Sequence, residues 1–291
     1  AALEGCTRSP ADARAGLRLA TTFWLMWRAA GWVSEGRQWL DRLLATASAP
    51  AGATTTALWV GGWLALVQGD HDRAVDLLHR SEATARQEGD RDASAFVDLF
   101  LGQAATRDGA LDEARRRLER ALAAHRHTGD PAGLALTTFR LAVCHATAGD
   151  ADAALATAQE GLRFCRERNA QWWSGYARWI AAVALWCRGD HAGAAEEATA
   201  SLAVTWPHGD ELGAAMALEV LAWVNARTDP ARAAEILGAL HRRWPRTGSA
   251  LAGYGTLTDH HDRCAEDARR RLGPRRFTAA HTRGASHCAC P

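Results

Sequence analysis

The chain has 291 residues, of which 34 are basic and 33 are acidic. This near-balance of charge excludes a strong electrostatic attraction of the whole molecule to nucleic acid or to an anionic membrane, so we expect its partners to be recognised by local surfaces. Every basic residue other than histidine is arginine. The absence of lysine excludes a Walker-type phosphate loop, a lysine Schiff base and a Ser–Lys dyad within these residues.

Cysteine usage and hydropathy indicate a cytoplasmic protein. The seven cysteines are an odd number and are spread along the chain, unlike the disulfide framework of a small secreted protein. The most apolar stretch, residues 17–33, is interrupted by Arg18 and Arg28 and is too short to span a bilayer. The chain opens with Ala1 rather than methionine and has no signal-peptide pattern, so we expect a piece of a longer cytoplasmic polypeptide with no membrane partner.

Short turns recur along the chain every 40 residues. The first series is Gly69-Asp70, Gly109-Ala110, Gly149-Asp150, Gly189-Asp190 and Asp229-Pro230. The second series lies half a period away, at Gly89-Asp90, Gly129-Asp130, Asn169-Ala170 and Gly209-Asp210. A glycine can close a helix in the left-handed conformation, and a following aspartate can cap the next helix. Each 40-residue unit is therefore predicted to hold two helices.

These turns divide the chain into helix pairs. In chain order, the predicted pairs are 11–29/33–47, 53–68/71–88, 92–107/111–127, 131–147/151–168, 171–187/191–206 and 210–227/230–243. The predicted organisation is a leader at 1–9, six hairpins over 10–243, a Gly-rich connection at 244–256, capping helices at 257–284 and a disordered tail at 285–291. The arginines at 269–271 give the cap a polar outer face, which the end of a repeat array requires.

Small residues mark the place where the two helices of each pair cross. The second helices carry Ala74, Ala114, Ala154, Ala194 and Ala234, and the first helices carry Gly62, Gly102, Ala142, Ala182 and Ala222. Leu78 and Leu118 are expected to fill the space beside the crossing. This arrangement is similar to the tetratricopeptide repeat. The predicted fold is therefore all-α, a right-handed superhelical solenoid of tetratricopeptide-like helix pairs with a C-terminal cap.

Four segments carry a resemblance to known families. Residues 102–122 resemble a tetratricopeptide unit at nearly every defining position. Residues 35–44, 231–239 and 271–284 look like the opening helix, last repeat and closing motif of one repeat region. This region is the C-terminal part of bacterial STAND-type signal-transduction ATPases that act as transcriptional regulators, often with a LuxR-type DNA-binding domain.

The resemblance to these regulators implies a sensor or partner-docking arm, which holds a switch closed until an effector or a partner docks. It also implies an ATPase module in a longer chain, although neither that module nor a DNA-binding domain lies within these residues. His281 stands where the family usually has tryptophan.

Aromatic residues suggest where a ligand would bind. In tetratricopeptide arrays the first helix of each pair lines the inner wall. Offsets from the crossing residues place these side chains on that wall: Trp59, Trp63, Phe96, Phe139, Tyr176, Trp179, Trp186 and Trp223. Such a wall suits an apolar small molecule or a hydrophobic peptide or protein segment. The competing interpretation is that these rings fill the core between repeats.

Other chemistry has weaker signals. His260, Cys264, His287, Cys288 and Cys290 are weak candidates for a metal site, because no paired zinc spacing accompanies them, and a polar cap with a frayed tail is the favoured interpretation. No catalytic motif is present, so no cofactor is expected, and a stand-alone enzyme or small-molecule-binding protein is the alternative to a regulator. The arginine runs at 115–117 and 269–276 are typical of solvated helix faces, so direct binding of nucleic acid is not expected.

Overall fold

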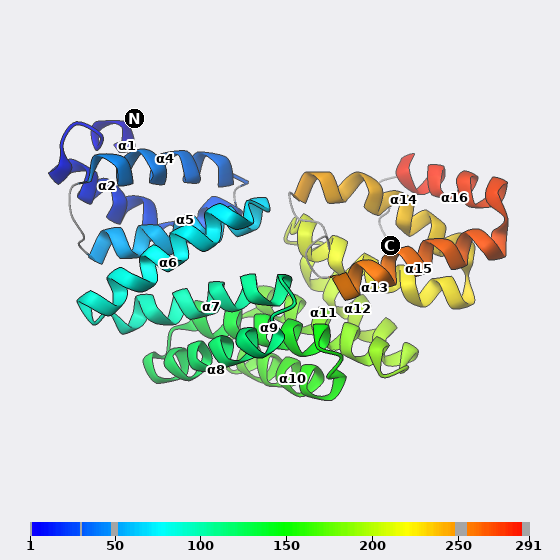
Figure 1. Cartoon of the computed structure of the whole chain (residues 1–291). Coiled ribbons are helices and arrows are strands. Elements are labelled where there is room, and N and C mark those ends of the chain that lie inside the picture. The colour runs from blue at the N-terminus through cyan, green and yellow to red at the C-terminus, as the bar shows by residue number, and fades with distance from the viewer. Residues whose placement is uncertain (1, 30, 48–51, 248–254, 287–291) are drawn as a thin grey trace. The chain divides into compact units, whose positions relative to one another are not determined.

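A computed structural model of the chain describes residues 2–29, 31–47, 52–247 and 255–286. All the regular structure in these ranges is α-helical, and the helices follow one another in pairs at the 40-residue period (Figure 1). The predicted all-α, tetratricopeptide-like repeat fold is confirmed. None of the helices in these ranges has the length and apolar character that crossing a membrane requires.

The chain divides into two compact units, which we describe separately. The first unit comprises Ala1–Ala105 and Asp112–Leu134, and the second comprises Thr106–Leu111 and Ala135–Pro291, so the division passes through three helices, α7, α8 and α9. The helices of the N-terminal half are α1 (Ala2–Gly5), α2 (Pro10–Thr22), α3 (Trp24–Ala29), α4 (Val33–Thr46), α5 (Gly52–Gln68), α6 (His71–Glu88), α7 (Arg91–Arg107) and α8 (Leu111–Thr128). The remaining helices are α9 (Pro131–Thr147), α10 (Ala151–Glu167), α11 (Gln171–Cys187), α12 (His191–Thr205), α13 (Glu211–Thr228), α14 (Pro230–Thr247), α15 (Gly255–Leu272) and α16 (Pro274–Ser286).

The turns between helices have the chemistry that their sequences indicate. Gly149 closes α9 with φ of 80°, and Asp150 then accepts a hydrogen bond from the backbone N–H of Ala153 at 3.0 Å at the start of α10. Asn169 takes the same left-handed conformation, with φ of 51°, and is the one non-glycine residue that does so in the described ranges. Asparagine tolerates this conformation better than most residues, so the missing glycine leaves the period intact.

The first predicted helix is interrupted. Residues 11–29 were expected to form one helix, but α2 ends at Thr22 and α3 begins at Trp24. The hydroxyls of Thr21 and Thr22 donate to the carbonyls of Leu17 and Arg18 at 2.8 Å, a type of bond that bends helices. Within the predicted leader at 1–9, the short α1 is also helical.

The C-terminal helices cover the end of the second unit. Helix α16 packs along α14, and α15 packs against α13 and α14 (Figure 1). Gly238 and Gly284 let α14 and α16 approach closely, because a β-carbon on Gly284 would collide with the carbonyl of Glu235. The predicted capping helix is therefore present. Helix α14 extends to Thr247 and α15 begins at Gly255, so both helices extend into the connection predicted at 244–256, and α16 extends to Ser286, into the tail predicted at 285–291. Residues 248–254 and 287–291 lie outside the described residues.

Candidate functional site

The predicted aromatic wall is largely buried. Six of its eight side chains belong to the core: Trp59, Trp63, Phe96, Tyr176, Trp179 and Trp223. Phe139 and Trp186 are half-buried. The wall therefore offers an external ligand mainly these last two rings.

In the first unit, the predicted wall residues pack against one another. The rings of Trp59 and Phe96 stack with centroids 4.4 Å apart and an interplanar angle of 7°. Trp24 of α3 meets Trp59 and Trp63 edge-on, at 5.2 Å and 4.9 Å. Edge-to-face and offset-stacked pairs of this kind stabilise a core beyond the area that they bury. The sequence pattern did not indicate that α3 would cover these rings.

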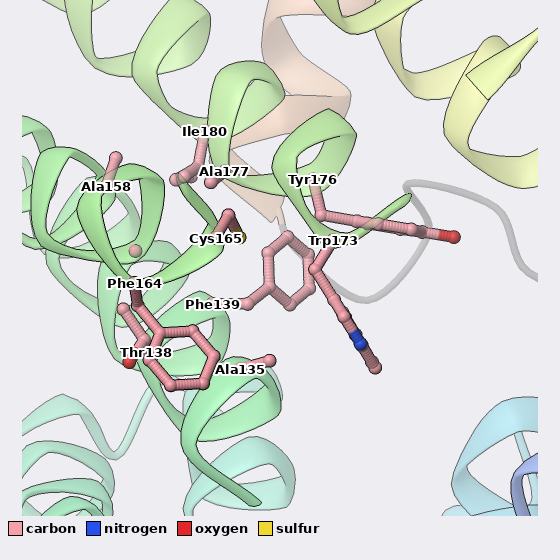
Figure 2. Close-up of a pocket in the computed structure, with 11 residues that line it drawn as sticks. Ala135, Thr138, Phe139, Ala158, Phe164, Cys165, Trp173, Tyr176, Ala177 and Ile180 are labelled. Atoms are coloured by element: carbon pink, nitrogen blue, oxygen red, sulfur yellow. The ribbon is translucent and has the colours of Figure 1, made fainter. Parts of the chain in front are cut away.

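In the second unit, a pocket opens between α9, α10 and α11 (Figure 2). It contains the predicted residues Phe139 and Tyr176. The full lining is Ala135, Thr138, Phe139, Ala158, Gly161, Phe164, Cys165, Trp173, Tyr176, Ala177 and Ile180. No charged side chain belongs to this lining. We call this site the aromatic pocket.

The rings around the aromatic pocket hold one another in place. Phe139 and Tyr176 meet edge-on with centroids 5.5 Å apart, and Trp172 contacts Tyr176 at 5.3 Å. The Tyr176 hydroxyl donates to an Asp210 carboxylate oxygen at 2.8 Å, which ties α11 to the start of α13. The side chains of Phe139, Phe164 and Trp173 surround the opening in Figure 2. The arrangement is a fixed apolar patch with aromatic edges.

Two arginines flank the aromatic pocket without lining it. The guanidinium of Arg140 lies 5.0 Å from the Phe139 ring centre, and that of Arg168 lies 5.4 Å from the Phe164 ring centre. Within the pocket, burial raises the pKa of the Cys165 thiol to about 11. A thiol with so high a pKa is not a nucleophile near neutral pH. The pocket chemistry therefore favours binding over covalent catalysis.

Several pocket residues were missed by the sequence analysis. Trp173 lies one turn before Tyr176 on α11, so the offsets counted from the crossing residue did not include it. Phe164 and Cys165 belong to α10, the second helix of its pair, whereas the wall was predicted on first helices only. The adjacent tryptophans at 172 and 173, both half-buried, were the available signal.

A polar cluster, separate from the aromatic pocket, lies where α15 meets α11 and α13. The Glu219 carboxylate is fully buried and accepts hydrogen bonds from the indole N–H of Trp223 at 3.0 Å and of Trp244 at 3.3 Å. His261 Nδ1 lies 2.6 Å from the same carboxylate. Since these nitrogens occupy both carboxylate oxygens, Glu219 is held inside the protein. The arrangement anchors helices and does not present the carboxylate to a substrate.

The histidines and cysteines of the C-terminal region do not converge on one point. His260 Nδ1 accepts a hydrogen bond from Trp186 Nε1 at 3.3 Å, and its Nε2 lies 4.0 Å from Cys187 Sγ. Cys264 is buried, and desolvation raises the pKa of its thiol to about 12. Within the described part of the chain, no group of three His, Cys, Asp or Glu side chains could hold a metal ion. The other weak candidates, His287, Cys288 and Cys290, lie outside the described residues.

Comparison with known proteins supports the fold. A family model described as Tetratricopeptide repeat matches residues 93–167. A search of curated proteins gave no significant match.

Among solved structures, the chain is similar to a Rap protein complexed with competence and sporulation factor, with a TM-score of 0.64, 13% identity, and coverage of 86% of this chain and 76% of the other. It is similar to a STAND protein with a tetratricopeptide repeat sensor from Pyrococcus horikoshii, with a TM-score of 0.58, 13% identity, and coverage of 95% of this chain and 46% of the other. It is also similar to the Rap conjugation gene regulator of plasmid pLS20, solved in complex with the Phr* peptide, with a TM-score of 0.58, 12% identity, and coverage of 88% and 75%. The chain is therefore an α-helical repeat protein with a tetratricopeptide-like fold.

Proposed function

We propose that this chain is a partner-docking sensor module, and that the aromatic pocket of its second unit binds a hydrophobic peptide or protein segment. The observation that carries the proposal is the pocket lining, which combines rings from three adjacent helices with no charged side chain. Aromatic side chains are the residues that most often anchor protein interfaces. The half-buried rings of Phe139, Phe164 and Trp173 supply such anchors on a rigid helical frame.

The size of the pocket favours a peptide over an enclosed small molecule. Its cavity volume is about 20 Å³, whereas a single water needs about 10–15 Å³ on this measure. A pocket that encloses a drug-sized ligand has a volume of several hundred Å³. A peptide needs less depth, because one small apolar side chain can enter while the rest lies across the exposed ring edges.

The similar structures support the same role. The pLS20 Rap protein was solved with a peptide, and the repeats of the Pyrococcus horikoshii protein are described as a sensor. By analogy, the effector of this chain is a peptide or a protein segment. Together with the motifs at 35–44 and 271–284, this supports a place for the chain in a longer regulator that carries an ATPase module and controls transcription.

The proposal is tested by selecting peptides and then mutating the pocket. A phage-displayed library of random heptapeptides is selected on the purified chain, and one enriched peptide is labelled for fluorescence anisotropy. Trp173→Ala removes a ring from the pocket, and we expect it to weaken binding by about tenfold or more, as the loss of an aromatic anchor does. Trp206→Ala is the matched control, because Trp206 is also half-buried in the second unit but lies outside the pocket lining. Selection that yields no binder, or equal weakening by both variants, would refute the assignment.

A further inference from the structure

Helix α15 lies over the predicted wall of α11 and α13. Its residues His260 and His261 contact Trp186 of α11 and Glu219 of α13, and the His260 ring lies 5.1 Å from the Trp223 ring. We call the surface formed by Trp186, Glu219 and Trp223 the α11–α13 face. Trp186 and Trp223 are two of the residues predicted to line the inner wall, so a helix of the chain's own C-terminal cap occupies a part of the wall expected to receive a ligand.

Both polar and apolar contacts hold α15 in place. Among the described side chains of α15, Cys264 and Ala268 are buried, and Ala265 and Leu272 pack against the same core. Arg271 Nη1 adds hydrogen bonds to the carbonyls of Ala226 and Arg227 at 2.9 Å and 2.6 Å. By contrast, α16 buries Phe277 and packs closely on α14. His260 and His261 bond directly to side chains of α11 and α13, so their protonation changes the strength of docking.

The hydrogen bonds of the two adjacent histidines favour opposite protonation states. His260 Nδ1 accepts a hydrogen bond from the Trp186 indole, which requires that this nitrogen carry no proton. His261 Nδ1 faces the buried carboxylate of Glu219 at 2.6 Å and must donate a proton to it. A charged His261 makes the stronger, charge-assisted bond. Docking is therefore strongest when His260 is neutral and His261 is charged.

We propose that α15 is a pH-dependent latch, which closes over the α11–α13 face most tightly near pH ~6.5 and loosens in both more acidic and more alkaline solution. Opening the latch removes the His260 contacts from Trp186 and Trp223 and exposes these rings to solvent. The inference rests on the contacts of α15 alone and does not depend on peptide binding at the aromatic pocket.

Neighbouring groups shift the pKa values of His260 and His261 in opposite directions. Burial of His260, together with the positive charge of Arg263, lowers the pKa of His260, while Asp259 opposes this shift. The hydrogen bond to Glu219 raises the pKa of His261 against the effect of burial, with a further contribution from Asp262. The other titratable groups near the pair are Cys187 on α11, 4.0 Å from His260, His191 on α12, whose ring packs on Trp186, and Cys264 on α15 itself.

The two shifts act on opposite sides of the ordinary histidine pKa. A released His260 takes up a proton as the pH falls below about 6.5, so docking weakens with acid down to the lowered pKa. A released His261 loses its proton as the pH rises above about 6.5, so docking weakens with alkali up to the raised pKa. The docking equilibrium consequently has a maximum between the two.

Hydrogen exchange tests the latch. Protection factors of α15 amides, corrected for intrinsic rates and divided by those of α16, are measured at about pH 5, 6.5 and 9. We expect α15 protection at both extremes to be about threefold or more below its value at pH 6.5, since one unit of pKa displacement changes an equilibrium tenfold. Equal relative protection at all three pH values would overturn the proposal.

Two variants separate the limbs of the profile. His260→Gln keeps an acceptor for Trp186 but does not titrate, so it should abolish the acid-side loss and leave the alkaline one. His261→Gln keeps a donor for Glu219 and should abolish the alkaline-side loss alone. His127→Gln, at an exposed position of α8, is the matched control and should retain both limbs. If the acid-side loss persists in His260→Gln and the alkaline-side loss persists in His261→Gln, the proposal is also overturned. The pH dependence of α15 protection is measured in the parent chain, so the proposal remains testable even if a variant fails to fold.

Discussion

Leu78 packs over Gly62 so closely that a β-carbon built on the glycine would lie 2.7 Å from Leu78 Cγ. The same relationship recurs one repeat later, where a β-carbon on Gly102 would lie 2.7 Å from Leu118 Cγ. The leucine of the second helix therefore occupies the space that the missing side chain of the first helix leaves. This confirms the predicted role of the small residues and of Leu78 and Leu118 at the helix crossing.

We predict that Gly62→Ala destabilises the first unit by about 1–3 kcal/mol, because the added methyl group overpacks the crossing against Leu78. Gly61→Ala is the matched control on the same helix, since its β-carbon would lie 3.5 Å from Leu77 Cδ1, an ordinary contact. That control should be neutral or stabilising by up to about 1 kcal/mol through helix propensity. Urea unfolding of the two variants checks the pair. If the two variants are equally stable, the predicted close crossing of α5 and α6 at Gly62 is wrong.

The alanine on the other side of the crossing gives a second prediction. Ala154 is fully buried at the start of α10. Ala154→Leu should therefore force the helices of its pair apart and lower the free energy of unfolding by about 1–3 kcal/mol. Ala156→Leu, at an exposed position of the same helix, should change it by less than about 0.5 kcal/mol. Thermal unfolding of both variants measures the difference.

Local turn chemistry made most helix ends predictable. The Gly149-Asp150 turn contains both the closing residue of α9 and the capping residue of α10, so no distant contact is needed to place either end. The break at Phe23 could not be predicted in this way. The first helix loses its continuity where Trp24 turns into the aromatic cluster of α5 and α7, which lies far along the chain.

Burial of the predicted wall also depends on distant segments. Trp186 and Trp223 lie on the expected faces of α11 and α13, but α15 covers them through His260, 74 residues after Trp186. Helix periodicity identifies the face on which a ring lies and does not identify the segment that packs on it. For this reason the sequence predicted a shared wall for Phe139 and Tyr176, while the contact between their rings and the part that Phe164 and Trp173 play in the aromatic pocket became apparent only in the structure.

A buried histidine in the first unit predicts a dependence of stability on pH. His125 is 1% exposed and contacts the Phe96 ring edge-on at 4.7 Å. Burial lowers the pKa of His125. Among the described residues, no group forms a hydrogen bond with its Nε2, so a proton on that nitrogen would lack an acceptor. The unfolded chain therefore binds a proton more readily than the folded one. Stability is fully present above the ordinary histidine pKa of about 6.5 and declines as the pH falls toward the lowered value.

Urea unfolding at about pH 7 and pH 5 measures this effect in the parent and in His125→Gln. Each unit of pKa displacement corresponds to about 1.4 kcal/mol of stability lost at the acidic pH. We expect the variant to be less stable than the parent at both pH values, but its acid-induced loss should be smaller by that amount. An identical acid-induced loss in both proteins would show that His125 does not titrate on unfolding.

Trp179 and Trp186, both on α11, give a prediction that distinguishes a core side chain from one at the surface that α15 covers. Trp179 is 2% exposed and packs against Phe139, so Trp179→Ala should open a cavity and lower the free energy of unfolding by about 3–5 kcal/mol. Trp186 is half-buried, and its indole N–H bonds to His260 of α15. Trp186→Ala should therefore cost less in global stability while selectively increasing hydrogen exchange in α15. Urea unfolding together with exchange of α15 and α16 compares the two variants. If Trp186→Ala is as destabilising as Trp179→Ala and leaves the exchange of α15 unchanged relative to α16, Trp186 belongs to the core and does not form part of the surface that α15 covers.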